Sequence, residues 1–172
     1  MGHEPMTDLA TNVLYHGDKT WVERNGWTIF TGISLVAVVF GLGDILRGGS
    51  SFALGEEVLF NRLTRTTWDA LQAADAGAAN LIDYQYRASG AYISLLGILS
   101  LAICVTALRR GERWAWLAMW VWPLGVALVV AMLWSPTQGR GDGIPVPIIS
   151  GSITIVISVL TLALSARRYL AR

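Results

Sequence analysis

Cysteine and histidine are scarce in this chain of 172 residues. Cys104 is the only cysteine, so the chain can form neither an internal disulfide nor a cysteine-based zinc cluster. His3 and His16 both precede the first long apolar stretch, so nothing supports a haem held by two histidines inside a bilayer. The chain also lacks nucleotide-binding glycine motifs and the Cys-x-x-Cys of thiol oxidoreductases. We therefore expect no metal and no cofactor.

Charge is scarce as well. Charged residues make up 15% of the chain, whereas an ordinary soluble domain has about 25%. The formal net charge of +1 offers no basic field for nucleic acid. Hydrophobic residues, by contrast, reach 53% and gather in long blocks, which indicates a lipid environment. Lys19 is the only lysine among 13 basic residues, a bias typical of GC-rich bacterial genomes.

Four apolar blocks are long enough to span a membrane, which takes about 20 mostly apolar residues. They cover residues 27–46, 88–108, 114–134 and 147–166, and the only charged residue in them is Asp44. Inside lipid only helices and closed barrels satisfy their backbone groups, and these blocks lack the alternation of barrel strands. The sequence therefore predicts an all-α fold, a bundle of four transmembrane helices.

Basic residues are unevenly distributed between the two ends of these spans. Residues 1–26, the turn at 109–113 and the tail at 167–172 hold eight of the 13, and the longer segments at the opposite end hold five. Short cytoplasmic loops are enriched in lysine and arginine. We therefore expect a bacterial inner-membrane protein with a cytoplasmic N-terminal segment and tail around a transmembrane domain at 27–166.

The segment at 47–87 is the largest part predicted to lie outside the bilayer. Thr66 and Thr67 precede Trp68 and Asp69, and a threonine cap followed by an acidic residue is typical of a helix start. Asp75 has the right chemistry to cap a second helix that runs directly into the second span. We therefore predict a short, partly helical extracytoplasmic cap.

A stripe of small residues follows the second span. Gly90, Ser94 and Gly97 recur at helical spacing, and such residues let helices approach closely in lipid. The stripe begins with Asp83 and Arg87, a favourable pair four residues apart at the water boundary. Helix packing with an interfacial ion pair is the preferred interpretation, and a polar pocket above a narrow crevice is the alternative.

The fourth span has a comparable seam. Ser150, Thr154 and Ser158 repeat every four residues, and their hydroxyls can bond to backbone carbonyls or to a neighbouring helix. A weakly polar packing seam is expected, because no ionisable residue lies on it. A hydrophilic pathway is the alternative.

A ligand site for a small lipid-like molecule is a further hypothesis. Pro123 predicts a kink in the third span, since it lacks an N–H donor and crowds the carbonyl of Met119. A kink beside two tryptophans suits an apolar ligand, and charged residues at the outer ends of the first two spans suit its polar group. The candidate ligand-binding residues are Asp44, Asp83, Tyr84, Arg87, Trp120 and Trp122.

Three stretches together resemble a recurring pattern in small four-helix bacterial membrane proteins of unknown function. They are TWDAL at 67–71, IDYQYRASG at 82–90 and RRGERWAW at 109–116. The overall plan is more distantly similar to the DoxX-like four-helix group. This resemblance covers residues 27–166 and implies a fold and a membrane location, but no catalytic residues.

These observations favour a non-enzymatic membrane protein that acts through helix packing, as a homo-oligomer or as an accessory subunit of a larger membrane complex. A binder or enzyme for a quinone, isoprenoid or sterol-like molecule is the second hypothesis. A small transporter or channel is the third, and the lack of charge within the spans disfavours it. The lipid bilayer is the expected surrounding, and no catalytic residue can be assigned.

Overall fold

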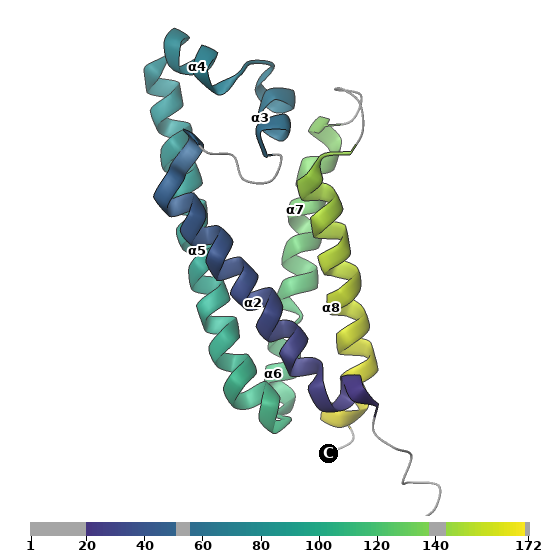
Figure 1. Cartoon of the computed structure of the whole chain (residues 1–172). Coiled ribbons are helices and arrows are strands. Elements are labelled where there is room, and N and C mark those ends of the chain that lie inside the picture. The colour runs from purple at the N-terminus through teal and green to yellow at the C-terminus, as the bar shows by residue number, and fades with distance from the viewer. Residues whose placement is uncertain (1–19, 51–55, 138–143, 171–172) are drawn as a thin grey trace, which may run out of the picture.

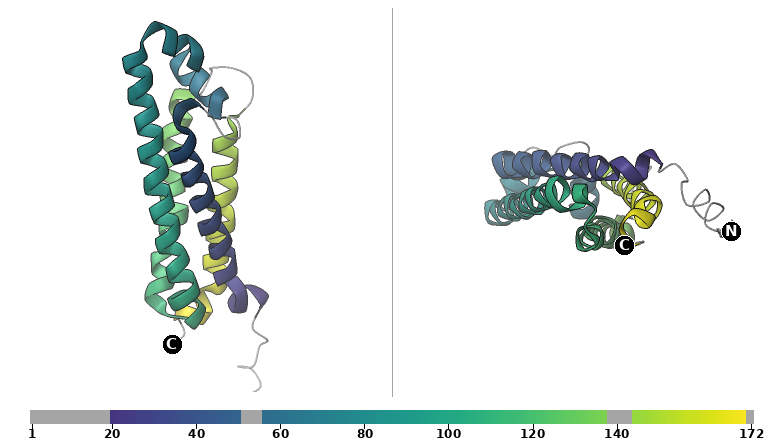
Figure 2. Two further views of the ribbon diagram at one scale, coloured as in Figure 1. Left: turned by 60° about the vertical axis from the view of Figure 1, so that its left-hand side comes forward. Right: turned by 90° about the horizontal axis from the view of Figure 1, so that it is seen from below.

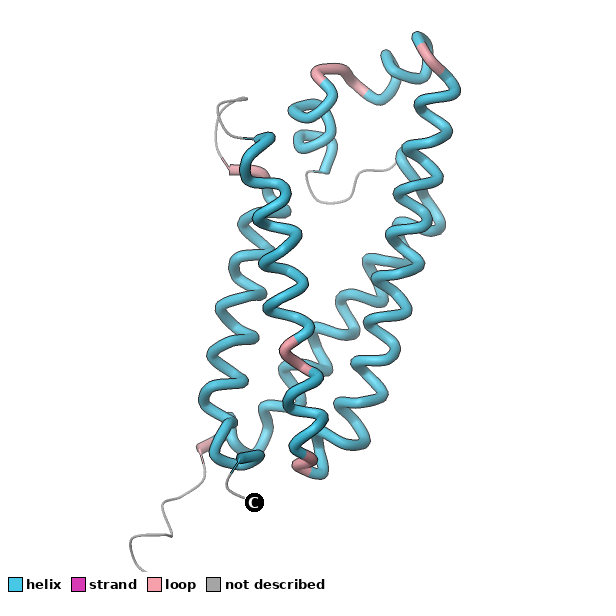
Figure 3. Tube along the Cα trace, turned by 180° about the vertical axis from the view of Figure 1, so that it is seen from behind, coloured by secondary structure: helices cyan, strands magenta, loops and turns pink. Residues whose placement is uncertain are grey.

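The computed structural model describes residues 20–50, 56–137 and 144–170, and these residues form helices joined by short loops (Figure 3). The predicted N-terminal segment and tail therefore lie partly outside the described residues, as do His3, His16 and Lys19. The elements are α2 (Trp21–Arg47), η1 (Gly48–Ser50), α3 (Glu56–Thr64), α4 (Trp68–Ala74), α5 (Ala76–Ile103), η2 (Cys104–Leu108), α6 (Arg113–Ala118), α7 (Val121–Thr137) and α8 (Val146–Leu170).

Four helical stretches in the described residues are long and apolar enough to cross a membrane, which confirms the predicted all-α fold with four apolar helices of spanning length. They are α2, α5 with η2, α6 with α7, and α8. The shortest has 22 residues, or about 33 Å at about 1.5 Å per residue, enough for a hydrocarbon core of about 30 Å. Each contains one of the four apolar windows, and most extend beyond it into more polar sequence.

Side-chain caps set where several helices begin. Thr20 and Glu23 form a capping box at the start of α2, in which each side chain bonds the other residue's backbone N–H. Thr67 caps α4 by accepting the N–H of Ala70, so the cap is the second of the two threonines at that helix start. Asp75 caps α5, as its position predicted, and α5 then runs without a break into the second span.

The spans are arranged as two antiparallel pairs. α2 packs along α5 and α7 packs along α8, and the pairs meet chiefly where α2 contacts α8 (Figures 1 and 2). The start of α2, the turn at 109–113 and the end of α8 lie together at one end of the bundle, here called the terminal end (Figure 1). Toward the opposite end, here called the α3–α4 end, the two pairs diverge. There α4 packs on α5, and α3 reaches across to α7.

Two hydrophobic clusters hold this arrangement. The larger one joins all four spans through buried side chains such as Phe30, Cys104, Met119 and Leu162. The smaller one fixes the short helices: Phe60 and Trp68 pack edge to face with 5.8 Å between ring centroids, and Ala79 of α5 is buried with them. The α3–α4 segment is therefore anchored to the bundle by its own small core.

Two irregularities interrupt the spans at the same level. α5 continues into the π-helical η2, and the third span breaks at Met119 and Trp120 between α6 and α7. The break lies one turn before Pro123, which confirms the predicted distortion: the Met119 carbonyl accepts the N–H of Trp122 at 3.2 Å because Pro123 has none to donate. The sulfur atoms of Cys104 and Met119 lie 3.7 Å apart, so the two irregular segments touch.

Candidate functional site

The small-residue stripe of α5 is buried against α2 of the same chain. A Cβ atom added to Gly90 would lie 2.6 Å from both the Asp44 Cβ and the Gly41 carbonyl oxygen, and one added to Gly97 would lie 2.9 Å from the Ser34 carbonyl. Ser94 is buried between these two glycines. The two backbones can approach so closely only because neither glycine carries a side chain. Gly90, Ser94 and Gly97 therefore pack α5 within the chain, and this face is not open to a second copy.

The seam on α8 divides into two parts. Ser150 is exposed and Thr154 half-buried, and each hydroxyl donates to a carbonyl of its own helix, to Pro147 at 3.3 Å and to Ser150 at 2.9 Å. Ser158 is completely buried. The inner part of the seam continues through Thr161 and Ser165, so the buried hydroxyl residues of α8 lie toward the terminal end.

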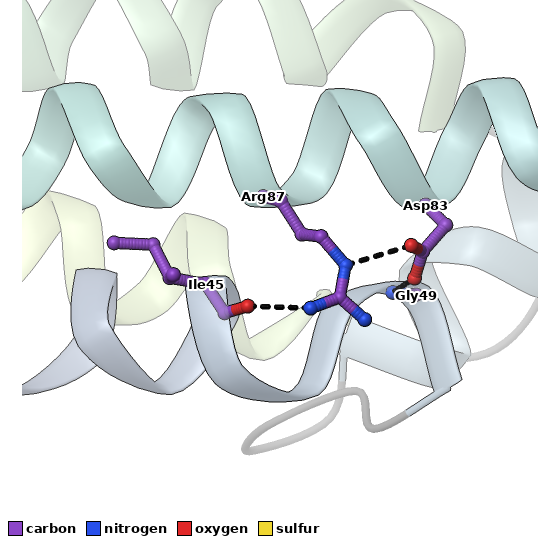
Figure 4. Close-up of polar contacts among 4 residues, drawn as sticks. All are labelled: Ile45, Gly49, Asp83 and Arg87. Atoms are coloured by element: carbon purple, nitrogen blue, oxygen red, sulfur yellow. Dashed lines mark hydrogen bonds and ion pairs between the residues drawn. The ribbon is translucent and has the colours of Figure 1, made fainter.

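Asp83 and Arg87 act together on the end of α2 (Figure 4). The Arg87 Nε donates to the Asp83 carboxylate at 2.7 Å, and its Nη1 donates to the Ile45 carbonyl at 2.6 Å. The other Asp83 oxygen accepts the N–H of Gly49 at 2.8 Å. In a continuing helix the Gly49 N–H would bond the Ile45 carbonyl. The charged pair thus replaces that bond, satisfying one backbone group with the carboxylate and the other with the guanidinium.

Glycine is required where α2 ends. Gly48 has a φ of +60°, a conformation that favours glycine, and a Cβ at this position would collide with the Asp83 carboxylate. A Cβ on Gly49 would lie 2.6 Å from the ring of Trp68. The indole of α4 therefore covers the turn that Asp83 holds. The end of α2, the start of α5 and the α3–α4 segment meet at this one junction.

The junction holds the end of α2 through a partly exposed ion pair. Each carboxylate oxygen of Asp83 accepts a hydrogen bond, one from the Gly49 N–H at the end of α2 and the other from Arg87. The Asp83 and Arg87 side chains are 30% and 44% exposed, so water screens the ion pair. Among the described residues, no three His, Cys, Asp or Glu side chains lie close enough together to hold a metal ion.

The structure does not bring the predicted ligand-binding residues together. Asp44 lies near Asp83 and Arg87, where its Cβ packs over Gly90 of α5, and Tyr84 is 65% exposed. Trp120 and Trp122 follow Met119, which contacts Cys104. Arg87 and Cys104 are 17 residues apart on α5, about 25 Å at about 1.5 Å per residue. The charged residues and the two tryptophans therefore occupy different levels of the bundle.

Arg168 and Tyr169 form a second polar junction that sequence reasoning missed. Arg168 donates to the carbonyls of Glu23 at 2.9 Å, Arg24 at 2.7 Å and Arg109 at 2.7 Å. The Tyr169 hydroxyl donates to the Leu108 carbonyl at 3.0 Å. The end of α8 thereby ties the start of α2 to the end of η2. The sequence did contain a signal for them: Arg168 and Tyr169 are three and four residues after Ser165, so they lie on the same face of α8 as the buried seam.

Comparison of the chain with protein-family models, with curated proteins and with solved structures finds no match. The resemblance to small four-helix bacterial proteins therefore stays a prediction. Function has to be argued from the geometry of the bundle itself.

Proposed function

We propose that this chain is a multi-pass protein of a bacterial inner membrane that acts by associating with other membrane helices, either as a homo-oligomer or within a larger complex, and not by catalysis. In this proposal the terminal end lies in the cytoplasm and the α3–α4 segment lies outside. The distribution of arginine supports this orientation. In the described residues the terminal end carries Arg24, Arg109, Arg110, Arg113, Arg167 and Arg168, and the α3–α4 end carries Arg47, Arg62, Arg65 and Arg87.

The proposed contact surface for assembly is the outer face of α2. Gly32 and Gly43 have no atom of another residue within contact distance of a Cβ built on them. Eleven residues are about three helical turns, so the two glycines share one face with Val36 and Val39, which are 55% and 61% exposed. That face is opposite to Ser34 and Gly41, which are buried against α5 and the core.

An unused glycine in the middle of a helix is unfavourable, by about 1 kcal/mol relative to alanine. Glycines in membrane helices are concentrated where two helices approach closely. The α5 stripe accounts for its glycines by packing on α2. Among the open glycines of the described spans, Gly125 of α7 stands alone, whereas Gly32 and Gly43 lie on one face of the same helix. A helix from a second copy or from a partner subunit would use the shallow face that they create.

Substitution of these glycines tests the assembly. Native mass spectrometry of the full chain released from nanodiscs should show an oligomer or a co-purifying membrane subunit. Gly32→Leu and Gly43→Leu should each convert most of that species to monomer, because the added side chain fills the shallow face. Gly125→Leu is the matched control, since Gly125 of α7 is equally open but has no second glycine on its helix. A wild-type chain that is monomeric without a partner, or an equal loss in Gly125→Leu, would contradict the proposal.

One observation favours the second hypothesis, a binder of a lipid-like molecule. The Trp122 indole N–H and the Ser158 hydroxyl are both buried and have no hydrogen-bond partner among the described residues. A Cβ on Gly151 of α8 would meet Val126 and Val130 of α7. Because the two helices are antiparallel, Ser158, seven residues after Gly151, lies level with Trp122. Buried polar groups normally have partners, and a carbonyl or hydroxyl of a bound molecule would supply one here.

The same spectra distinguish the two proposals. A monomer that keeps a lipid-like mass, and loses that mass when Trp122 is replaced by phenylalanine, would support the binder and count against assembly. Trp120→Phe is the control, because Trp120 packs edge to face on Trp116 and is only half-buried.

A further inference from the structure

Arginine side chains from three segments gather at the terminal end of the bundle. They come from the start of α2, the turn between η2 and α6, and the end of α8. The six residues are Arg24, Arg109, Arg110, Arg113, Arg167 and Arg168, and all except the half-buried Arg168 are exposed. This arginine cluster is the largest concentration of one charge sign in the described chain.

The nearby carboxylates are already engaged with uncharged donors. Glu23 accepts the backbone N–H of Thr20 at 2.7 Å as part of the capping box. Glu112 accepts the indole N–H of Trp114. None of the six arginines forms an ion pair with another described residue. The ion pair that the described residues do contain, between Asp83 and Arg87, lies at the α3–α4 end. Glu23 and Glu112 carry two negative charges against the six positive ones, so this end keeps an excess of four positive charges within the described chain.

Arg168 holds the backbones of two other arginines of the cluster close together. Its two terminal nitrogens each donate to a backbone carbonyl, one to Arg24 and the other to Arg109, both at 2.7 Å. The backbone carbonyls of Arg24 and Arg109 therefore lie next to the two terminal nitrogens of one guanidinium group. The Arg109 guanidinium rests over the ring of Trp27, 5.3 Å from its centroid, which limits the directions in which it can point.

We propose that the arginine cluster binds the phosphate of an anionic phospholipid from the adjoining leaflet. This proposal rests on the chain spanning a membrane, but not on its assembly. Guanidinium groups suit phosphate because they offer paired donors in a fixed plane. Basic residues beside a membrane span attract anionic headgroups. Trp27, Trp114 and the exposed Trp21 lie at the same end, where indoles mark headgroup depth. A lipid phosphate at that depth meets Arg24 and Arg109 from the membrane side.

Native mass spectrometry tests the proposal on the purified, delipidated full chain. The chain is mixed with equal amounts of phosphatidylglycerol and phosphatidylcholine with identical acyl chains. Phosphatidylglycerol adducts should predominate. Arg24→Gln and Arg109→Gln should each reduce that preference about fivefold, the effect expected for losing one basic group at a membrane surface. Arg65→Gln is the matched control, since Arg65 is an exposed arginine at the α3–α4 end, and it should leave the preference unchanged.

Equal binding of the two lipids would overturn the proposal, and so would an equal loss in Arg65→Gln. Inorganic phosphate in large excess should not displace the lipid. Displacement would mean that the cluster is a site for soluble anions instead. The protein stoichiometry is read from the same spectra, so a failure of assembly and a failure of lipid selection give different results. Because Arg24 and Arg109 use exposed side chains, these variants should keep the fold, and circular dichroism checks that they do.

Discussion

Replacing Gly90 by alanine perturbs the packing of α5 on α2 with a single methyl group. That methyl would lie 2.6 Å from the Asp44 Cβ and from the Gly41 carbonyl oxygen, and 3.0 Å from the Ile45 nitrogen. Carbon atoms pack best at about 3.5–4.0 Å, so the two helices would have to separate by about 1 Å at this level. Two of the three contacts are with backbone atoms, which cannot rotate away as a flexible side chain would.

Overpacking of this kind costs about 1–3 kcal/mol. Alanine also favours a helix by about 1 kcal/mol over glycine, which offsets part of the cost. Gly125→Ala separates the two effects, because Gly125 also lies within a helix but has no atom within contact distance. The difference in unfolding free energy between the two variants therefore measures the steric term alone. We expect Gly90→Ala to be less stable than Gly125→Ala by about 1–3 kcal/mol.

The chain contains its own probe for this measurement. Cys104 is the only cysteine and is completely buried, so a thiol-reactive dye should label it only when the bundle opens. Labelling is followed in mixed micelles with increasing denaturing detergent. Gly90→Ala should expose Cys104 at a lower detergent fraction than wild type, and Gly125→Ala should not. Equal midpoints for the two variants would refute the close backbone contact between α2 and α5.

Two further predictions concern the α3–α4 end and the topology. Arg87→Met should lower stability by about 1–2 kcal/mol, because it leaves the Ile45 carbonyl and the Asp83 carboxylate without their donor. Asp83→Asn should lower stability less, by about 1 kcal/mol or below, since an amide oxygen can still accept the Gly49 N–H. The same labelling assay compares the two variants, and a larger loss of stability in Asp83→Asn than in Arg87→Met would contradict this assignment. For topology, Gln72→Cys should react with a membrane-impermeant maleimide in intact cells and Arg113→Cys only after permeabilisation, and the reverse pattern would invert the proposed orientation.

The four spans were predictable because each is a local property of the sequence. A run of about 20 apolar residues needs no knowledge of its neighbours to be recognised as a span. The caps at Thr67 and Asp75 were local signals too, since a side chain bonds a backbone N–H three residues later. The helical spacing of Gly90, Ser94 and Gly97 likewise indicated a packing face. The spacing did not indicate which helix would pack against that face.

The candidate site was less predictable because it depends on how the helices pair. Asp83 and Arg87 were recognised as an ion pair from their spacing, but their bonds to Gly49 and Ile45 join residues 34 and 42 positions apart. Grouping these charges with Trp120 and Trp122 assumed that all polar and aromatic candidates meet at one level. The contact between Cys104 and Met119 shows instead that the two tryptophans of the third span lie level with the far end of the second span, away from Asp83 and Arg87.

The two polar junctions share one physical principle, which helps to explain the prevalence of arginine in this chain. The C-terminal end of a helix leaves carbonyl groups unpaired, and each of them needs a donor from elsewhere. Arg87 bonds one such carbonyl, that of Ile45, while also binding Asp83. Arg168 bonds another, that of Arg109, together with the carbonyls of Glu23 and Arg24 in the first turn of α2. A lysine ammonium is a compact point charge, whereas the arginine fork carries five donors in a plane. Both junctions fasten α2, one at each end, and so fix the direction of its outer face. Any helix that docks on Gly32 and Gly43 would therefore meet a surface already held rigid by the chain itself.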